Sequence, residues 1–164
     1  MRTNIPITSD SVGTLNSLRK VLLGILLLGM AGTMTELLLL QHTEDVTQLI
    51  PLLLIGAGYL AVAWNAIHRS HLSISALQIV MILFVAAGIL GMYFHYRANV
   101  EFQLEVQPEL SGSTLLWKVL QAKTPPALAP GVMAQLGLIG LAYAYRHPAI
   151  ARGANSLEED RNEQ

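Results

Sequence analysis

The sequence contains no cysteine, and only 13% of its residues are Asp, Glu, Lys or Arg. The absence of cysteine excludes disulfide bonds, thiolate metal sites and cysteine catalysis. A soluble domain carries roughly 25% charged residues, so about half the usual supply is missing. The formal net charge of -1 argues against a nucleic-acid partner, which attracts a basic surface.

In place of charge, the chain has 52% hydrophobic residues within a length of 164. One soluble domain of this size cannot hide so much apolar surface, because its surface-to-volume ratio is too high. A membrane-crossing helix needs about 20 mainly apolar residues. Four stretches meet this requirement, residues 21–41, 48–67, 72–94 and 127–145.

The sequence therefore predicts an all-α integral membrane protein with a four-transmembrane-helix bundle over residues 1–147. Residues 148–164, rich in charged and polar side chains, are expected to form a disordered cytoplasmic tail. The first apolar stretch is too long for a signal peptide and has no small-x-small cleavage site after it, so we expect it to be retained. Pro51 suits the first turn of the second helix, and Ser70 suits the N-cap of the third.

The distribution of Lys and Arg predicts the orientation, because positively charged loops stay in the cytoplasm. With the N-terminus inside, the inner segments hold seven of the 10 cations and the outer segments hold three. The inner set is Arg2, Arg19, Lys20, Arg69, Arg146, Arg152 and Arg161; the outer set is Arg97, Lys118 and Lys123. Both termini are therefore expected in the cytoplasm. The compact chain without organelle-targeting features favours a bacterial inner membrane.

The long outer loop, residues 97–126, contains two recognisable patterns. "VEFQLEV" (100–106) alternates apolar and polar residues, as half-buried strands do. We expect an extended segment lying on the bundle mouth, and pairing with a strand of another protein is the alternative. "STLLWKVLQAK" (113–123) predicts a short helix capped by Ser113, whose apolar face lies in the membrane interface.

Small residues predict where the helices touch, since helices in a bilayer associate by close packing at such positions. Each of three spans offers a pair of glycines at suitable spacing. They are Gly29 and Gly32, Gly88 and Gly91, and Gly137 and Gly140.

Glu36 is a carboxylic acid near the outer end of the first span. Helical spacing puts it on the same face as Gly29 and Gly32, so we expect it to point into the bundle. Tyr93 and Gln135 are expected at a similar depth, which predicts an intramembrane polar site of Glu36, Tyr93 and Gln135. This site is either a structural hydrogen bond or a proton or cation site, a role that intramembrane carboxylates often have.

Five histidines suggest a metal or haem as an alternative to interfacial packing, because imidazole is the commonest metal ligand. His42 and His95 lie at outer span ends near Glu44 and Glu101. Nitrogen and oxygen ligands of this kind suit a divalent metal at the outer face. All five histidines lie at span boundaries, where membrane proteins tolerate this residue, so we predict no cofactor and keep the metal and haem as alternatives.

No catalytic motif occurs: the chain has no GxSxG, no HExxH and no phosphate-binding glycine loop. The main hypothesis is a non-catalytic accessory or structural subunit of a larger membrane complex, whose partners are the lipid bilayer and other membrane subunits. One alternative is a small proton- or ion-coupled carrier centred on Glu36. The other is a membrane protein that binds a metal or redox cofactor at its outer face.

Overall fold

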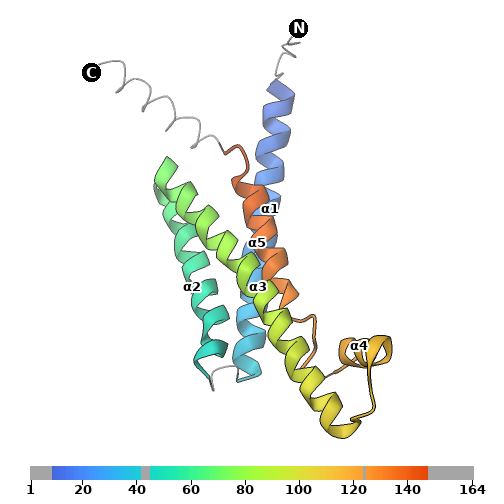
Figure 1. The fold of residues 1–164 in the computed structure, drawn as a ribbon. Coiled ribbons are helices and arrows are strands. Elements are labelled where there is room, and N and C mark those ends of the chain that lie inside the picture. The colour runs from blue at the N-terminus through green and yellow to red at the C-terminus, as the bar shows by residue number, and fades with distance from the viewer. Residues whose placement is uncertain (1–8, 42–44, 124, 148–164) are drawn as a thin grey trace, which may run out of the picture.

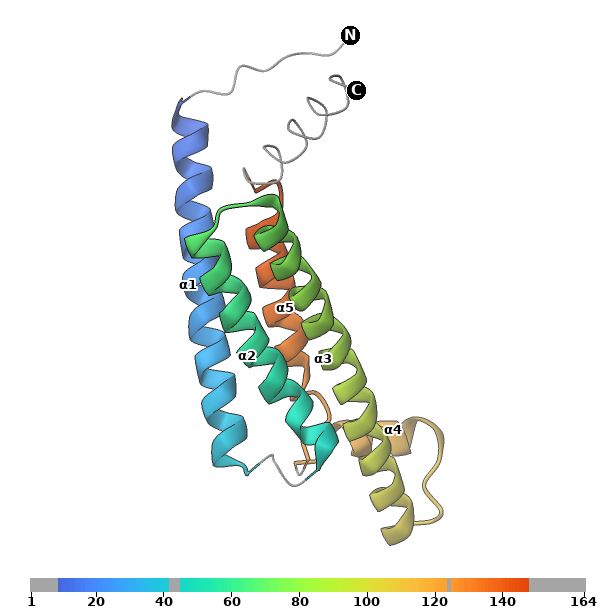
Figure 2. The same ribbon diagram turned by 90° about the vertical axis from the view of Figure 1, so that its left-hand side faces the viewer.

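The computed structural model describes residues 9–41, 45–123 and 125–147, and in these ranges the fold is all-helical. The helices are α1 (Ser9–Leu39), α2 (Val46–Ile67), α3 (His71–Val106), α4 (Gly112–Leu120) and α5 (Gly131–Ala144). Figures 1 and 2 show α1, α2, α3 and α5 side by side, with consecutive long helices running in opposite directions. The short α4 lies apart from these four, beside the last turns of α3.

The bundle has two distinct ends. The start of α3 and the ends of α2 and α5 lie at one end, which we name the basic end. Arg19, Lys20 and Arg69 gather there around one cavity, and Arg19 is bonded to Arg146. The opposite end contains the end of α1 and the start of α5, with α4 beyond it, and we name it the α4 end.

Three helices are long and apolar enough to cross a membrane. They comprise Gly13–Leu39, Val46–Ile67 and His71–Val106, with 27, 22 and 36 residues. At 1.5 Å per residue these helices measure about 40, 33 and 54 Å, whereas a hydrocarbon layer is about 30 Å thick. The expectation of an integral, helical membrane protein is confirmed at this level.

The predicted fourth span, residues 127–145, is shorter in the structure than expected. Its helix, α5, begins only at Gly131 and has 14 residues, about 21 Å at the helical rise. Residues 125–130 before it form turns joined by hydrogen bonds such as Gly131 N to Leu128 O, 2.9 Å. That α5 crosses the membrane stays a prediction.

The expected extended segment at 100–106 is wrong, because α3 continues through it to Val106. A lone strand has no ladder partner here, whereas a helix satisfies its own backbone groups. The less exposed positions are 99, 100, 103 and 104, a helical spacing that the alternation of apolar and polar residues concealed. Arg97 and Glu101, one turn apart, form a 2.8 Å ion pair on the exposed side.

The N-cap of α3 agrees with the prediction, whereas the N-cap of α4 differs from it. Ser70 caps α3 as expected: its Oγ accepts from Ser73 N at 3.2 Å, and Ser73 Oγ accepts from Ser70 N at 3.2 Å. The cap position of α4 is Ser111, not Ser113. Pro51 lies in the second turn of α2 rather than the first, because α2 begins at Val46.

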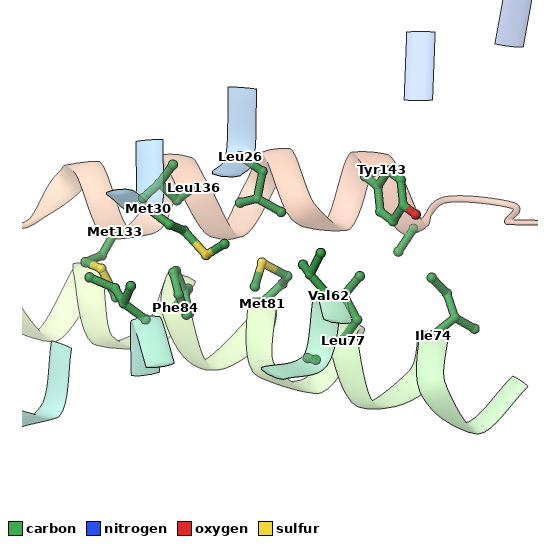
Figure 3. Packing of buried hydrophobic residues seen from close by; sticks show 13 residues of the cluster. Leu26, Met30, Val62, Ile74, Leu77, Met81, Phe84, Met133, Leu136 and Tyr143 are labelled. Carbon is green, nitrogen blue, oxygen red and sulfur yellow. The ribbon is translucent and has the colours of Figure 1, made fainter. Parts of the chain in front are cut away.

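The core lies between α3 and α5, with α1 and α2 packed on either side. Figure 3 shows Met81 and Phe84 of α3 pointing toward α5, and Met30 reaching in from α1. A methyl group built on Gly88 would lie 2.5 Å from the backbone nitrogen of Ala134, and one on Gly137 2.6 Å from the carbonyl oxygen of Met81. Glycine therefore permits α3 and α5 to approach at backbone distance.

The other predicted packing glycines divide into two groups. A methyl group on Gly91 would meet Pro130 at 2.7 Å, and one on Gly29 or Gly140 would overlap Leu136 or Met81. Gly32 has no atom within 4 Å of the position of such a methyl group. Gly32 is therefore not covered by the part of the chain that the structure describes.

Candidate functional site

Glu36 lies in the last turn of α1, and the structure exposes its side chain instead of turning it into the bundle. Gly29 touches Leu136 of α5, and Glu36 lies seven residues further, about 10 Å along α1. In the antiparallel α5 this level corresponds to residue 129, which precedes the first helical residue, Gly131. Glu36 is uncovered because it lies on the side of α1 that carries the exposed residues Gly32 and Thr35, away from the buried Met30.

Tyr93 and Gln135, the expected companions of Glu36, are also exposed. Tyr93 is 53% exposed and its ring packs against Phe94, with 5.8 Å between ring centroids. Among the described residues no hydrogen bond joins the side chains of Glu36, Tyr93 and Gln135. The structure places all three on the outside of the bundle and does not bring them together through direct bonds.

The uncovered side of α1 forms a continuous surface, which we name the Glu36 face. Its members are exposed and follow helical spacing. They are Gly24, Leu28, Ala31, Gly32, Thr35, Glu36 and Leu39. Thr35 bonds the carbonyl oxygen of Ala31 in its own helix at 2.9 Å. The carboxyl group of Glu36, by contrast, forms no hydrogen bond with the described residues of the chain.

His95 holds the chain between α4 and α5 against α3. Its Nδ1 lies 2.9 Å from the carbonyl oxygen of Pro126, and Asn99 Nδ2 donates to the carbonyl oxygen of Pro125 at 2.8 Å. Since a carbonyl oxygen only accepts, Nδ1 of His95 is the donor of this bond, and in the neutral ring this leaves the lone pair on Nε2. His95 therefore has a packing role and retains one nitrogen able to bind a metal.

Of the other three predicted metal ligands, the structure describes only Glu101. Glu101 pairs with Arg97, and His42 and Glu44 lie outside the described residues. In the ranges that the structure describes, no three His, Asp or Glu side chains converge on one point.

A buried polar cluster at the basic end was not predicted as a site. Asn65 of α2 is 4% exposed; its Nδ2 donates to the hydroxyl of Tyr143 at 3.2 Å, and its Oδ1 accepts from Ser73 Oγ at 3.2 Å. The cluster links α2, α3 and α5 through bonds that are costly to lose in an apolar interior. The sequence feature that could have indicated this cluster is Asn65, a polar amide within an apolar helix.

Beside this cluster is a cavity of about 410 Å³, which we name the basic cavity. It lies among α1, the end of α2 and the end of α5. Its lining residues are Asn16, Arg19, Lys20, Leu23, Asn65, Ala66, Arg69, Tyr143 and His147. Arg19 Nη2 donates to the carbonyl oxygen of Arg146 at 3.0 Å, which holds the guanidinium at the rim.

The short α4 presents two different sides. Val119 is fully buried, and Lys118 contacts the side chain of Gln107 just after α3. Leu116 and Trp117 are exposed, Trp117 to 63%. One side of α4 therefore packs on this chain, while an aromatic and an aliphatic side chain face outward.

No protein-family model, no curated protein sequence and no solved structure matches this chain. The class of protein consequently follows from the helices alone: this is a helical integral membrane protein with three helices of spanning length and composition.

Proposed function

We propose that this protein is a non-catalytic accessory or structural subunit of a larger membrane complex, and that the Glu36 face of α1 contacts a helix of a partner subunit. The observation that carries the proposal is a carboxyl group, exposed on an apolar helix, beside Gly32 with open space over it. The helix α1 is also the least covered of the three long helices, with 11% of its apolar window buried.

Lipid alone covers such a face poorly. Acyl chains offer no hydrogen bond, and a charged or polar side chain in the hydrocarbon region is costly, less so near the boundary than at the centre. A partner helix with a donor side chain at this level would satisfy the carboxyl group, a contact worth roughly 0.6–2 kcal/mol in membranes. Gly24, Ala31 and Gly32 would let the two backbones approach closely.

The proposed arrangement in the membrane has α5 as the fourth span and both termini in the cytoplasm of a bacterium, with the protein in its inner membrane. Arg19, Lys20, Arg69 and Arg146 at the basic end support this orientation, because basic segments stay in the cytoplasm. The outward side of α4 supports an interfacial position, since tryptophan suits the level of the headgroups.

The test is extraction of the full-length, tagged protein from its own host in a mild detergent, followed by native mass spectrometry. We expect a stable complex that a Gly32→Leu variant disrupts, because a leucine side chain would keep the partner helix at a distance. Gly56→Leu in α2 is the matched control, since that glycine also has nothing within 4 Å of the added carbon. A lone monomer from the unmodified protein would refute the proposal.

The uncovered carboxyl group of Glu36 also supports a second candidate, a proton- or ion-coupled carrier in which Glu36 binds the ion. Purified protein in proteoliposomes would then show a flux that Glu36→Gln abolishes and Gln135→Ala leaves unchanged. Equal flux in the original protein and the Glu36→Gln variant would remove this candidate.

A further inference from the structure

The basic cavity collects positive charge, and its lining, drawn from the described residues, has no negatively charged side chain. Arg19, Lys20 and Arg69 contribute three formal positive charges, and none of the nine lining residues carries a carboxylate. Like charges gathered at one cavity repel one another, so an anion bound among them would be stabilised by all three.

The inner wall of the cavity is polar and fixed. Tyr143 accepts a hydrogen bond from Asn65, so the hydrogen of its own hydroxyl remains for donation to another group. Asn65 is in turn held by Ser73, which is fully buried. Donors held by a buried network lose little conformational freedom when a ligand binds, which favours binding.

The outer wall combines a hydrogen-bonded guanidinium, that of Arg19, with two exposed positive charges. Arg19 uses one donor on the carbonyl oxygen of Arg146, and a guanidinium has five, so donors are left for a ligand. Lys20 and Arg69 are exposed and come from different elements, α1 and the connection between α2 and α3. A tetrahedral anion with several oxygens matches donors that converge from different directions.

Two apolar residues, Leu23 of α1 and Ala66 of α2, complete the lining, and both helices are of membrane-spanning length. A ligand with a charged group and an attached apolar chain would fill both parts of the cavity. A small anion would use only the charged part.

We propose that the basic cavity binds a phosphate group, held by Arg19, Lys20 and Arg69 with the hydroxyl of Tyr143. The expected source is the headgroup of an anionic phospholipid, because the cavity lies at the end of three helices of membrane-spanning length. Inorganic phosphate offers the same oxygens and is the other source to be distinguished. This inference does not depend on the proposed partner at the Glu36 face.

The experiment uses the full-length protein in a neutral maltoside detergent. Native mass spectrometry follows the titration of dioctanoyl phosphatidylglycerol, dioctanoyl phosphatidylcholine and sodium phosphate, each alone and in competition. We expect one saturable site that prefers phosphatidylglycerol to phosphatidylcholine. Each removed cation should weaken binding about fivefold, so Arg69→Gln loses about fivefold and the pair Lys20→Gln with Arg69→Gln about 25-fold.

Lys123→Gln is the matched control, because it removes one exposed positive charge at the α4 end, far from the cavity. Its affinity should equal that of the unmodified protein. Helix content by circular dichroism and the melting midpoint verify that each variant is folded. If the double variant does not fold, the loss of affinity in the exposed Arg69→Gln variant alone tests the proposal.

The outcomes distinguish a lipid headgroup from free phosphate, and they also test whether the basic cavity binds a phosphate group. If sodium phosphate leaves the lipid site unchanged, the ligand is the lipid; if it displaces the lipid with the same dependence on Arg69, the phosphate site stands and the free anion is a ligand. Equal affinity for both lipids, no loss on Arg69→Gln, or an equal loss on Lys123→Gln would overturn the proposal.

Discussion

The contact between α3 and α5 predicts that adding one methyl group at Gly88 or Gly137 destabilises the protein, whereas the same change at Gly32 does not. At Gly88 the new carbon would lie 2.5 Å from the nitrogen of Ala134 and 2.9 Å from its Cβ. At Gly137 it would lie 2.6 Å from the carbonyl oxygen of Met81 and 2.9 Å from the nitrogen of Val85. Most of these atoms belong to the backbone, so no side-chain rotation relieves the overlap.

The magnitude follows from the shift that the helices must make. Ordinary carbon contacts are about 3.5–4.0 Å, so α3 and α5 must separate by about 1 Å. A gap of 0.5–1 Å forfeits about a quarter to a half of each dispersion contact, and overpacking of this kind costs about 1–3 kcal/mol. Alanine regains about 1 kcal/mol over glycine in a helix. The net loss at Gly88 or Gly137 is therefore up to about 2 kcal/mol.

Gly32→Ala is the matched control, because the added carbon meets no atom within 4 Å. It should be neutral or stabilising by up to about 1 kcal/mol from helix propensity alone. The assay is reversible unfolding of the protein in mixed micelles with increasing sodium dodecyl sulfate, followed by circular dichroism. Unfolding midpoints for Gly88→Ala and Gly137→Ala at or above that of Gly32→Ala would refute the close approach of α3 and α5.

Three further predictions concern single side chains. Asn65→Ala removes two buried hydrogen bonds, one with the hydroxyl of Tyr143 and one with Ser73 Oγ, which keeps its bond to Ser70 N. It should lower the free energy of unfolding by about 1–3 kcal/mol; the exposed Gln135→Ala should change it little in the same assay. Ser70→Ala removes the N-cap of α3 and should cost about 1 kcal/mol, with faster amide hydrogen exchange confined to the first turn of α3, and a uniform increase across the chain would contradict a local cap. His95→Leu should speed amide hydrogen exchange at residues 127–129 and 131, because the bond to Pro126 is lost, whereas a loss of bound metal by elemental analysis with unchanged exchange would favour the predicted metal site instead.

Local patterns of the sequence predicted some elements well and others badly. The apolar stretches identified three long helices, and Ser70 identified the start of α3, because each depends on residues close together in the chain. The alternation at 100–106 misled the prediction, since seven residues fit a period of two by chance while their helical face packs near α4 and residues 125–126. A pattern within one segment carries no information about which segments will cover it.

For the candidate sites, too, some features follow from the sequence of one helix and others only from the packing between helices. Hydropathy and the scarcity of charge were enough to place this chain among helical membrane proteins, because transfer into lipid depends on composition summed along each helix. The direction of Glu36 was not accessible in this way, because it depends on which side of α1 the other helices cover. The basic cavity likewise joins Arg19, Asn65 and Tyr143, the last two linked across 78 positions of the chain. Only the packing of separate helices brings such groups within bonding distance, since helical periodicity relates a residue to its neighbours on one helix and not to those on another.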